Sequence, residues 1–559
     1  MKKILYLVLF ALCTLLLIGC DDETAGRTFS MELVSATPYR EKIVFEFNLN
    51  DPDKQLKKSD VKGIISKAGS DSILSTKTLS FDSNNYEEIS FTGLNADTPY
   101  SVEFYTSFNG KKVTLLKEEY RTTNEGTIEN PYPISEFADL KKIRQEPTGH
   151  FKLTKDIDCD EQNISPLLQS TAFTGTIDGK KEDESGNYLG NYKIFDFTLG
   201  TKDEQGNYSH VASRDQYHGF FGNIGTGAKV SNIDFENFNV NVSRDKNRND
   251  GTYGSSIFYY GILAGVCAGT IENVNVTNST LNVKSENTNL QVLKVGGLVG
   301  NLKENGVIKN VEVDVDIKVE SSKDVSVGGI AGTTRDSVIL TEKVEGVTQI
   351  IPNISNVIYT GDITVVVNGL DSASGNSDDK KISQPSIGGL VGKNVEAIID
   401  NCSANATIKV TSKFTENEGQ IIFVGGLVGK NISDKSRVSN CGANVSFEVE
   451  TYDIPKDENK LNVYVGLFAG QNGGDLGGPA EIKNCTFTPK GENTVKLYDN
   501  ANVLASFDKV AKAMNGSKLV DSTLVEGTDS VKLVVQKYTK ADDSEEYTKV
   551  SDTGLSIAR

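Results

Sequence analysis

Val295-Gly-Gly-Leu-Val-Gly300, followed by Val307-Ile-Lys-Asn-Val-Glu-Val-Asp-Val-Asp-Ile-Lys-Val319, is the stretch that decides the fold of this chain. The second piece alternates apolar and polar side chains, which is the two-residue period of a strand with one buried face. A helical repeat would instead place apolar residues three and four positions apart. The stretch therefore predicts short strands separated by glycine-containing bends.

Both pieces recur seven times along the chain. A glycine-bracketed apolar stretch is followed 8 to 24 residues later by an Asn, and successive Asn residues are 37 to 46 positions apart. Repeats of this length indicate a stacked array, in which each unit buries its apolar face against its neighbours. The closing glycines are Gly222, Gly265, Gly300, Gly332, Gly392, Gly429 and Gly470, and the repeat asparagines are Asn232, Asn273, Asn310, Asn356, Asn401, Asn440 and Asn484.

The residues at and after the repeat Asn predict how the units stack. We expect the Asn side chains to form an amide ladder in a turn, each bonding the next. Cys402, Cys441 and Cys485 directly follow a repeat Asn, where earlier repeats have Val or Ile. Stacked strands lie about 4.8 Å apart, whereas a disulfide needs Cβ atoms about 3.8 Å apart. The three cysteines are therefore expected to be buried free thiols that pack as small hydrophobes.

Gly-Gly-Leu-Val-Gly at 296–300, 388–392 and 425–429 resembles the GLUG repeat. The lead-in, from Gly126-Thr-Ile-Glu-Asn-Pro-Tyr-Pro-Ile134 to Phe173-Thr-Gly-Thr-Ile-Asp-Gly179, resembles segments that open right-handed parallel β-helices in bacterial surface proteins. Those proteins include adhesin-like proteins and the non-catalytic part of IgA-cleaving metallopeptidases. The resemblance covers roughly residues 126–488 and implies an all-β, pectin-lyase-like right-handed parallel β-helix (a solenoid). It does not select a function, because this fold hosts both binders and enzymes.

The N-terminus predicts export and anchoring. Lys2 and Lys3 precede an apolar run that is short for a membrane span and has the form of a signal peptide, residues 1–19. The run ends in Leu17-Ile-Gly-Cys20, which resembles a lipobox and implies acylation of Cys20. An acidic tether, residues 20–27, follows and resembles the export tags of some surface lipoproteins. The expected location is the bacterial outer membrane or cell surface, lipid-anchored and facing outward.

Residues 28–123 predict a small β-sandwich before the solenoid, because alternating runs are separated by turn residues. Leu94-Asn-Ala-Asp-Thr-Pro-Tyr-Ser-Val102 resembles the tyrosine-corner stretch of fibronectin type III domains, with Tyr100 as the corner residue. The chain has no Trp, so the core Trp of that family is missing and an immunoglobulin-like sandwich is the safer name. Its expected task is to lift the solenoid off the membrane.

The solenoid is expected to occupy residues 124–488 and to be capped at both ends. Ser135 to Ile143 predicts a short helix, with Ser135 as the N-cap and Phe137, Leu140 and Ile143 on one face. Residues 489–559 are assigned to a C-terminal cap, in which Ala501 to Met514 is mildly helical and Ser530 to Tyr538 alternates as a strand.

The composition argues against several kinds of chemistry. The net charge of −18 and the absence of a visible basic stripe disfavour a nucleic-acid partner. The three His residues form no His-Glu-x-x-His pair, so a zinc peptidase is not supported. Asp156, Asp158 and Asp160 offer carboxylates for Ca²⁺, but we favour a structural role because the first two lie in the lead-in. No catalytic residue, metal or cofactor is assigned.

The insertions between repeats are the best lead to a binding site. Equivalent loops of a solenoid emerge along one edge, which is commonly the binding edge, although neutral drift of loop length is the alternative. The candidate insertions are Ser243 to Ser256, Arg335 to Gly346, Gly369 to Pro385, Thr411 to Gln420 and Tyr452 to Asn462, and the candidate binding residues are Tyr253, Tyr259, Tyr260, Asp378, Asp379 and Tyr452.

The sequence thus predicts an adhesin-like surface protein that binds a host or matrix macromolecule or a glycan. The membrane, through the lipid, and a protein or glycan ligand are the expected partners. A β-helix polysaccharide lyase or glycoside hydrolase is the first alternative, and a structural component of a surface assembly is the second.

Overall fold

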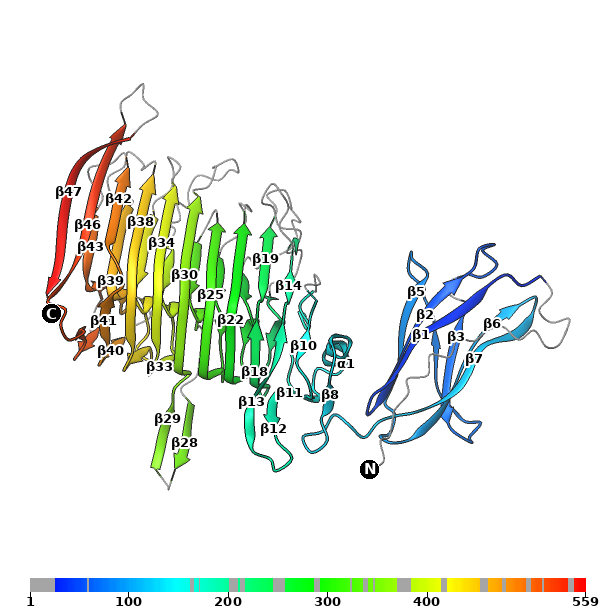
Figure 1. The fold of residues 1–559 in the computed structure, drawn as a ribbon. Coiled ribbons are helices and arrows are strands. Elements are labelled where there is room, and N and C mark those ends of the chain that lie inside the picture. Colours follow the sequence, from blue (N-terminus) through cyan, green and yellow to red (C-terminus); the bar gives the residue numbers. More distant parts are fainter. Residues whose placement is uncertain are drawn as a thin grey trace. The chain divides into compact units, whose positions relative to one another are not determined.

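The computed structural model describes residues 26–57, 60–160, 165–169, 171–200, 210–211, 217–244, 257–285, 292–321, 324–334, 340–344, 347–368, 384–413, 420–452, 461–474, 479–498, 504–514, 517–540 and 547–558. They belong to two compact units, Met1–Asn130 and Pro131–Arg559. Strands make up most of both units (Figure 1).

The first unit consists of two antiparallel sheets with the strand orders β1-β2-β5 and β4-β3-β6-β7. Phe47 of one sheet and Phe104 of the other pack edge to face, with ring centroids 4.6 Å apart, inside a core to which both sheets contribute. Tyr100 is buried, and its hydroxyl oxygen accepts a hydrogen bond of 2.8 Å from the backbone N–H of Asn95, so the expected tyrosine-corner contact is present. The strands are β1 (Ser30–Pro38), β2 (Lys42–Asn50), β3 (Lys62–Lys67), β4 (Ile73–Thr78), β5 (Tyr86–Thr92), β6 (Pro99–Phe108) and β7 (Lys111–Arg121).

The second unit opens with a short helical segment, a 3-10 helix η2 (Phe137–Leu140) continued by α1 (Lys141–Gln145). Leu140 and Ile143 are buried, as the sequence predicts. The expected N-cap is wrong, because the N-cap position of η2 is Glu136. The hydroxyl and the backbone N–H of Ser135 both donate to the Asp139 carboxylate. Ser135 therefore stabilises the first turn from the position before the N-cap.

Most of the second unit is a stack of coils in which each strand pairs in parallel with its counterpart one repeat later. The all-β parallel architecture predicted from the repeats is confirmed. The long sheet, which covers two faces of the stack, contains β8 (Tyr132–Ile134), β9 (His150–Leu153), β10 (Ile157–Asp158), β11 (Thr176–Asp178), β12 (Lys180–Glu182), β13 (Tyr188–Phe195), β14 (Thr198–Leu199), β15 (His210–Val211), β18 (Lys229–Glu236), β19 (Asn239–Arg244), β22 (Thr270–Ser285), β25 (Val307–Ser321), β30 (Ile354–Asn368), β33 (Ile398–Asp400), β34 (Ser403–Lys413), β37 (Arg437–Ser439), β38 (Gly442–Tyr452), β40 (Glu481–Lys483), β41 (Thr486–Pro489), β42 (Asn493–Tyr498), β44 (Lys518–Val520), β45 (Thr523–Leu524), β46 (Ser530–Lys540) and β47 (Tyr547–Ala558).

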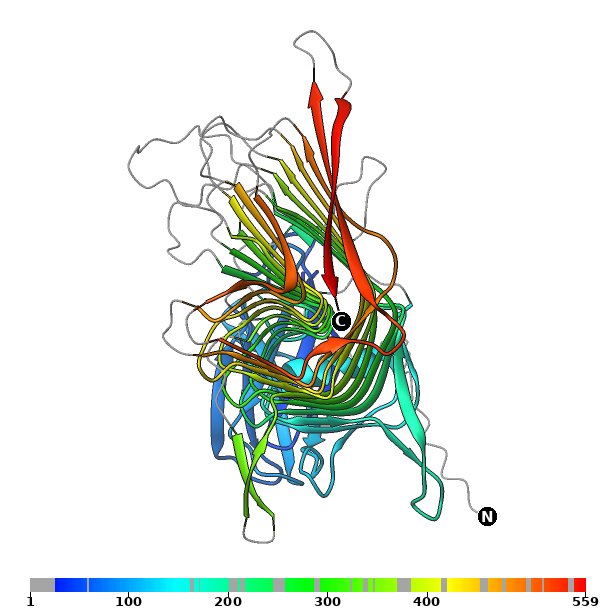
Figure 2. The same cartoon turned by 90° about the vertical axis from the view of Figure 1, so that its left-hand side faces the viewer.

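A second parallel sheet closes the remaining face of each coil. Its strands come in pairs that flank the glycine-bracketed stretch, so each coil contributes a first arm and a second arm (Figure 2). The strands are β16 (Tyr217–His218), β17 (Phe221–Ile224), β20 (Ile257–Gly261), β21 (Ala264–Cys267), β23 (Val292–Gly296), β24 (Val299–Leu302), β26 (Asp324–Gly328), β27 (Ala331–Thr333), β31 (Ser386–Gly388), β32 (Val391–Asn394), β35 (Gln420–Gly425), β36 (Val428–Asn431), β39 (Leu461–Asn472) and β43 (Leu504–Ala513).

The repeat asparagines turn the chain within the long sheet. All seven have φ between 51° and 56°, the left-handed region that Asn tolerates better than most residues. Their side chains form a ladder from coil to coil, with Nδ2 to Oδ1 distances of 2.7 to 3.2 Å. The ladder changes partner at one step, where Asn440 donates to Asp400 Oδ1 at 2.7 Å.

The cysteines after the repeat Asn pack in the interior. Cys402, Cys441 and Cys485 are free and buried, as expected from the Val and Ile that hold this position in other repeats. Burial raises the pKa of the Cys441 thiol well above its usual range, which keeps it protonated and unreactive at neutral pH.

The glycine-bracketed stretch bends the second sheet between its two arms. An added Cβ at Gly389 would lie 2.8 Å from Ala404 Cβ of the long sheet, and one at Gly426 would lie 3.1 Å from Ala443 Cβ, so the bend packs directly on the opposite sheet. A Cβ on the closing glycine Gly300 would lie 2.5 Å from the backbone N of Tyr260 in the preceding coil. The glycines are therefore required by close backbone approach between coils.

The parallel pairing continues beyond residue 488. The mild helix expected over Ala501 to Met514 is wrong, because β43 pairs in parallel with β39. The predicted strand over Ser530 to Tyr538 is present as β46, which pairs in parallel with β42. The edge of β46 is then covered by β47, which runs antiparallel to it and ends the described part of the stack.

Candidate functional site

The bend of the second sheet leaves a concave groove on its outer side. Strand register places two columns of outward-facing side chains along it, one on each arm. The first-arm column is Tyr217, Tyr259, Lys294, Ser326, Ser386, Phe423, Tyr464 and Ser506, and the second-arm column is Asn223, Val266, Asn301, Thr333, Lys393, Lys430, Gln471 and Lys512.

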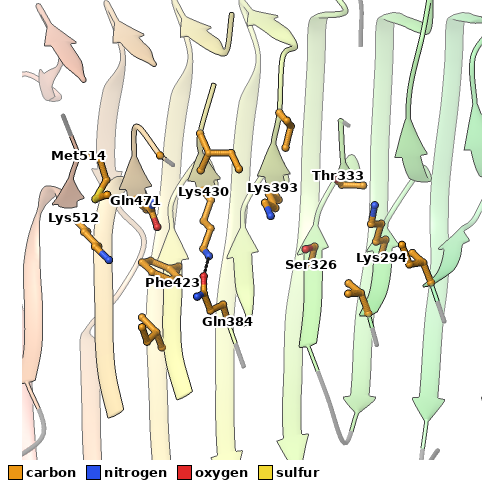
Figure 3. A pocket seen from close by; sticks show the side chains of 16 residues that line it. Lys294, Ser326, Thr333, Gln384, Lys393, Phe423, Lys430, Gln471, Lys512 and Met514 are labelled. Atoms are coloured by element: carbon orange, nitrogen blue, oxygen red, sulfur yellow. Dashed lines mark hydrogen bonds between the residues drawn. The ribbon is translucent and has the colours of Figure 1, made fainter. Parts of the chain in front are cut away.

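The part of the groove between these columns has a cavity volume of about 410 Å³. Lys294, Lys393, Lys430 and Lys512 line it and reach it from both arms (Figure 3). Among the described residues, no Asp or Glu belongs to this lining. We call this feature the lysine groove. Its local charge is opposite to the net charge of −18 of the whole chain.

Aromatic rings hold the lysines in place. Lys430 is 5 % exposed, and its Nζ donates to Gln384 Oε1 at 2.5 Å and lies 4.2 Å from the centroid of the Phe423 ring. Lys512 Nζ lies 5.5 Å from the same ring and 5.4 Å from that of Tyr464. Such cation–π contacts are worth about 0.5–1 kcal/mol at exposed positions and more when desolvated. The Lys430 ammonium group is thereby held between Gln384 and the Phe423 ring (Figure 3).

A lysine of the first arm, Lys294, also packs on an aromatic ring. Lys294 Nζ lies 5.1 Å from the centroid of Tyr259, and the Tyr259 ring packs at 5.5 Å on Tyr217 in the preceding coil. Ser326 and Thr333, between Lys294 and Lys393 along the stack, add hydroxyl groups to the lining. The acidic residue nearest in register is Asp324, whose carboxylate accepts the backbone N–H of Gln384 at the rim.

The predicted binding residues are scattered. Tyr259 lies in the first-arm column of the lysine groove. Tyr260 is wrong as a binding residue, because it is 1 % exposed and stacks on His218 in the interior. Tyr452 lies on β38 of the long sheet and stacks on Tyr498 with centroids 4.3 Å apart. Tyr253, Asp378 and Asp379 lie outside the described residues.

The candidate insertions do not all share one edge. Four of them connect a strand of the long sheet to a first-arm strand. The fifth, Arg335 to Gly346, follows the second arm instead. It includes β28 (Leu340–Val344), which forms an antiparallel hairpin with β29 (Val347–Ile351). The expectation of a common edge is therefore wrong for this insertion.

The lysines themselves were not recognised in the sequence. They are single residues in four repeats, separated by insertions of unequal length, and no basic stripe is visible in the linear sequence. A signal does exist: three of the four directly follow the closing glycine or its equivalent in the pairing register, as in Gly429-Lys430 and Gly392-Lys393. An alignment of the repeats on those glycines would have revealed it.

Two further properties of the described residues bear on function. No group of three or more His, Cys, Asp or Glu side chains is arranged there to hold a metal ion. No helix in the same part of the chain is long and apolar enough to cross a membrane. Cys20 lies outside the described residues, so its acylation stays a prediction.

Comparison with known proteins identifies the repeat and one relative. Residues 383–409 match the GLUG motif. This range contains β31, β32, β33 and the start of β34. The chain is 27 % identical over 224 residues to halomucin from Haloquadratum walsbyi, a match that covers 37 % of this chain and 2 % of that protein. The chain thus spans a very small part of the length of this relative.

Among solved structures, an IgA1 protease is similar with a TM-score of 0.33 and 13 % identity, covering 90 % of this chain and 31 % of that one. Pectate lyase PelI from Erwinia chrysanthemi, in complex with tetragalacturonic acid, is similar with a TM-score of 0.12 and 7 % identity, covering 89 % and 99 %. Both TM-scores are low, so neither likeness carries an argument about what this chain binds.

Proposed function

We propose that this protein is a lipid-anchored, adhesin-like protein of the cell surface, whose coil stack binds an extended macromolecule in the lysine groove. The observation that carries the proposal is the groove itself. It crosses several coils, is lined from both arms, and combines cations with aromatic rings and hydroxyl and amide groups. Concave sites with a few placed polar groups are the usual binding sites of proteins.

The remaining features support a display role. The signal-like N-terminus with Cys20 argues for anchoring, and the GLUG match and the similarity to a protein named halomucin support a surface location. We further propose that the coils wind right-handed, as parallel crossovers nearly always do, and that the first unit is a fibronectin-like or immunoglobulin-like spacer.

An enzyme is the second candidate. Glycoside hydrolysis normally needs two carboxyl groups flanking the scissile bond, and the described lining of the lysine groove contains none. A polysaccharide lyase removes a proton with a basic residue or a tyrosine. The presence of Lys294 and Tyr259 in contact on one arm keeps this reaction class as the alternative.

The test is an array of glycans and matrix proteins probed with the purified chain from residue 21. Binding that weakens in the double variant Lys393→Gln/Lys512→Gln supports the proposal. The matched control is Lys318→Gln/Lys409→Gln, which removes the same charge from the outer face of the long sheet. Release of new chain ends or unsaturated sugars from a bound glycan would replace the adhesin-like function by the lyase. An array without any specific signal would overturn both.

A further inference from the structure

The lysine groove is a basic surface in an acidic protein, and this contrast selects its ligand. The chain carries 76 acidic and 58 basic residues, yet four lysines and no carboxylate line the described part of the groove. Complementary charge in a concave site raises the local concentration of oppositely charged ligands. A neutral ligand could accept hydrogen bonds from the ammonium groups but would gain no charge–charge attraction, so the groove is best suited to an anion.

The lysines are distributed along the stack axis and not gathered at one point. Lys393 and Lys430 are neighbours in register, Lys512 lies two coils beyond Lys430, and Lys294 lies two coils before Lys393 on the opposite arm. With about 4.8 Å between coils, the cations are spaced about 5 to 10 Å apart over a length of about 24 Å. Such a row fits a chain with recurring negative charges better than a small anion.

We infer that the groove binds an acidic polysaccharide, whose carboxylate or sulfate groups pair with the lysines while the chain runs along the stack axis. This inference rests on the proposed binding function of the groove. Between the cations, Ser326, Thr333 and Gln471 add hydroxyl and amide groups to the lining, and Gln471 Nε2 donates to Gly473 O at 2.9 Å. On the first arm, the Tyr464 ring lies in the same coil as Gln471, and the Tyr259 ring lies one coil before Lys294.

Other polyanions fit less well. Double-stranded DNA carries one charge per about 1.7 Å of axis, which is several times denser than the row of lysines, and the net charge of −18 opposes its approach. An acidic peptide is commonly bound by adding a strand to a sheet edge. In the lysine groove, the strands between β20 and β39 are paired on both sides, so they present side chains and no free edge.

The experiment measures affinity of the chain from residue 21 for size-matched probes: hyaluronan and polygalacturonate as carboxylated chains, chondroitin sulfate as a sulfated chain, and carboxyl-reduced hyaluronan and dextran as neutral chains. Poly-glutamate and single-stranded DNA represent the other polyanions. The expected result is that at least one carboxylated or sulfated chain binds and that the neutral chains, carboxyl-reduced hyaluronan and dextran, do not. Comparison of the carboxylated and sulfated probes identifies the anionic group.

In the variant Lys393→Gln/Lys512→Gln, the affinity should fall roughly 10- to 100-fold, as expected for one or two lost charge-assisted hydrogen bonds. The control Lys318→Gln/Lys409→Gln should leave it within about twofold of the wild-type value, because exposed charges far from a site contribute little. Far-ultraviolet circular dichroism of both variants verifies the fold.

Four outcomes overturn the inference. If the neutral chains bind as tightly as every acidic polysaccharide, or if poly-glutamate or DNA binds more tightly than every polysaccharide, the assigned ligand class is wrong. Equal effects of the two double variants show that net charge, and not the groove, drives binding. If a neutral glycan or a protein binds and is weakened only by the groove variant, the proposed binding function stands while the acidic-polysaccharide assignment fails.

Discussion

Replacing Gly300 by Ala tests the physical basis of the repeat. The added Cβ would lie 2.5 Å from Tyr260 N, 2.7 Å from Gly265 O and 2.9 Å from Tyr259 C. All three are backbone atoms of the preceding coil, so no side chain can rotate away and the coils must shift. Overpacking of this kind costs about 1–3 kcal/mol or more. The reduced entropy of the unfolded chain offsets only about 0.4–1 kcal/mol.

Gly442 provides a matched control within the same stack. An added Cβ there would meet Thr486 Oγ1 at 3.7 Å and Ser403 Cβ at 3.8 Å, which are ordinary contacts. Gly442→Ala should therefore be neutral or stabilising by up to about 1 kcal/mol. The two substitutions make the same chemical change, so their free energies of unfolding should differ by about 2 kcal/mol.

The assay is urea unfolding followed by circular dichroism, combined with native-state hydrogen exchange. Because stacked repeats interact only with their neighbours, local loss of coils is expected, and hydrogen exchange reports it directly. Amides of β20, β23 and β24 should lose protection in Gly300→Ala and keep it in Gly442→Ala. Unfolding midpoints of Gly300→Ala and Gly442→Ala that coincide, with unchanged protection of these strands, would refute the close-approach argument.

Three more predictions concern the anchor, the cysteine column and an ion pair. Cys20→Ser should abolish acylation and move the protein from the detergent phase to the aqueous phase, and continued detergent partitioning would contradict the lipid anchor. Cys441→Val should change the free energy of unfolding by less than about 1.5 kcal/mol. Cys441→Asp should unfold neighbouring coils, because it buries a charge. Thermal melts of the two variants test both expectations. Burial alone would raise the pKa of Glu272, but hydrogen bonds from Lys229 and Lys309 hold that pKa below its usual value. The contribution of Glu272 to stability is therefore present at neutral pH and is lost as the pH falls through the lowered pKa. Glu272→Gln should destabilise the protein by about 1 kcal/mol at pH 7, and the difference from wild type should shrink as the pH falls; a pH-independent difference would argue against the ion pairs.

Much of the fold could be read from single repeats, because its constraints are local. Asn310 is recognisable in the sequence because the turn requires a left-handed residue, which few side chains tolerate. Gly300 is recognisable because any Cβ would collide with the preceding coil. The alternation from Val307 to Val319 follows from one buried face. These demands recur in every coil, so the repetition itself identifies them.

The structure decided features that depend on neighbours in space. Leu504–Ala513 is a strand although its sequence is mildly helical, because β39 offers a parallel edge to pair with and tertiary pairing overrides weak propensity. Tyr259 and Tyr260 are adjacent in the sequence, but strand alternation directs the first into the groove and the second into the core.

The lysine groove shows most clearly which features follow from the sequence alone and which depend on the tertiary structure. The sequence determined that there would be coils, bends and outward-facing positions, since each follows from the conformational and hydrophobic preferences of a few residues. Only the tertiary structure decided that Lys294, Lys393, Lys430 and Lys512 face one cavity. Insertions of unequal length separate these residues along the chain, and hydrogen-bonded register between coils, which ignores loop length, is what brings them together.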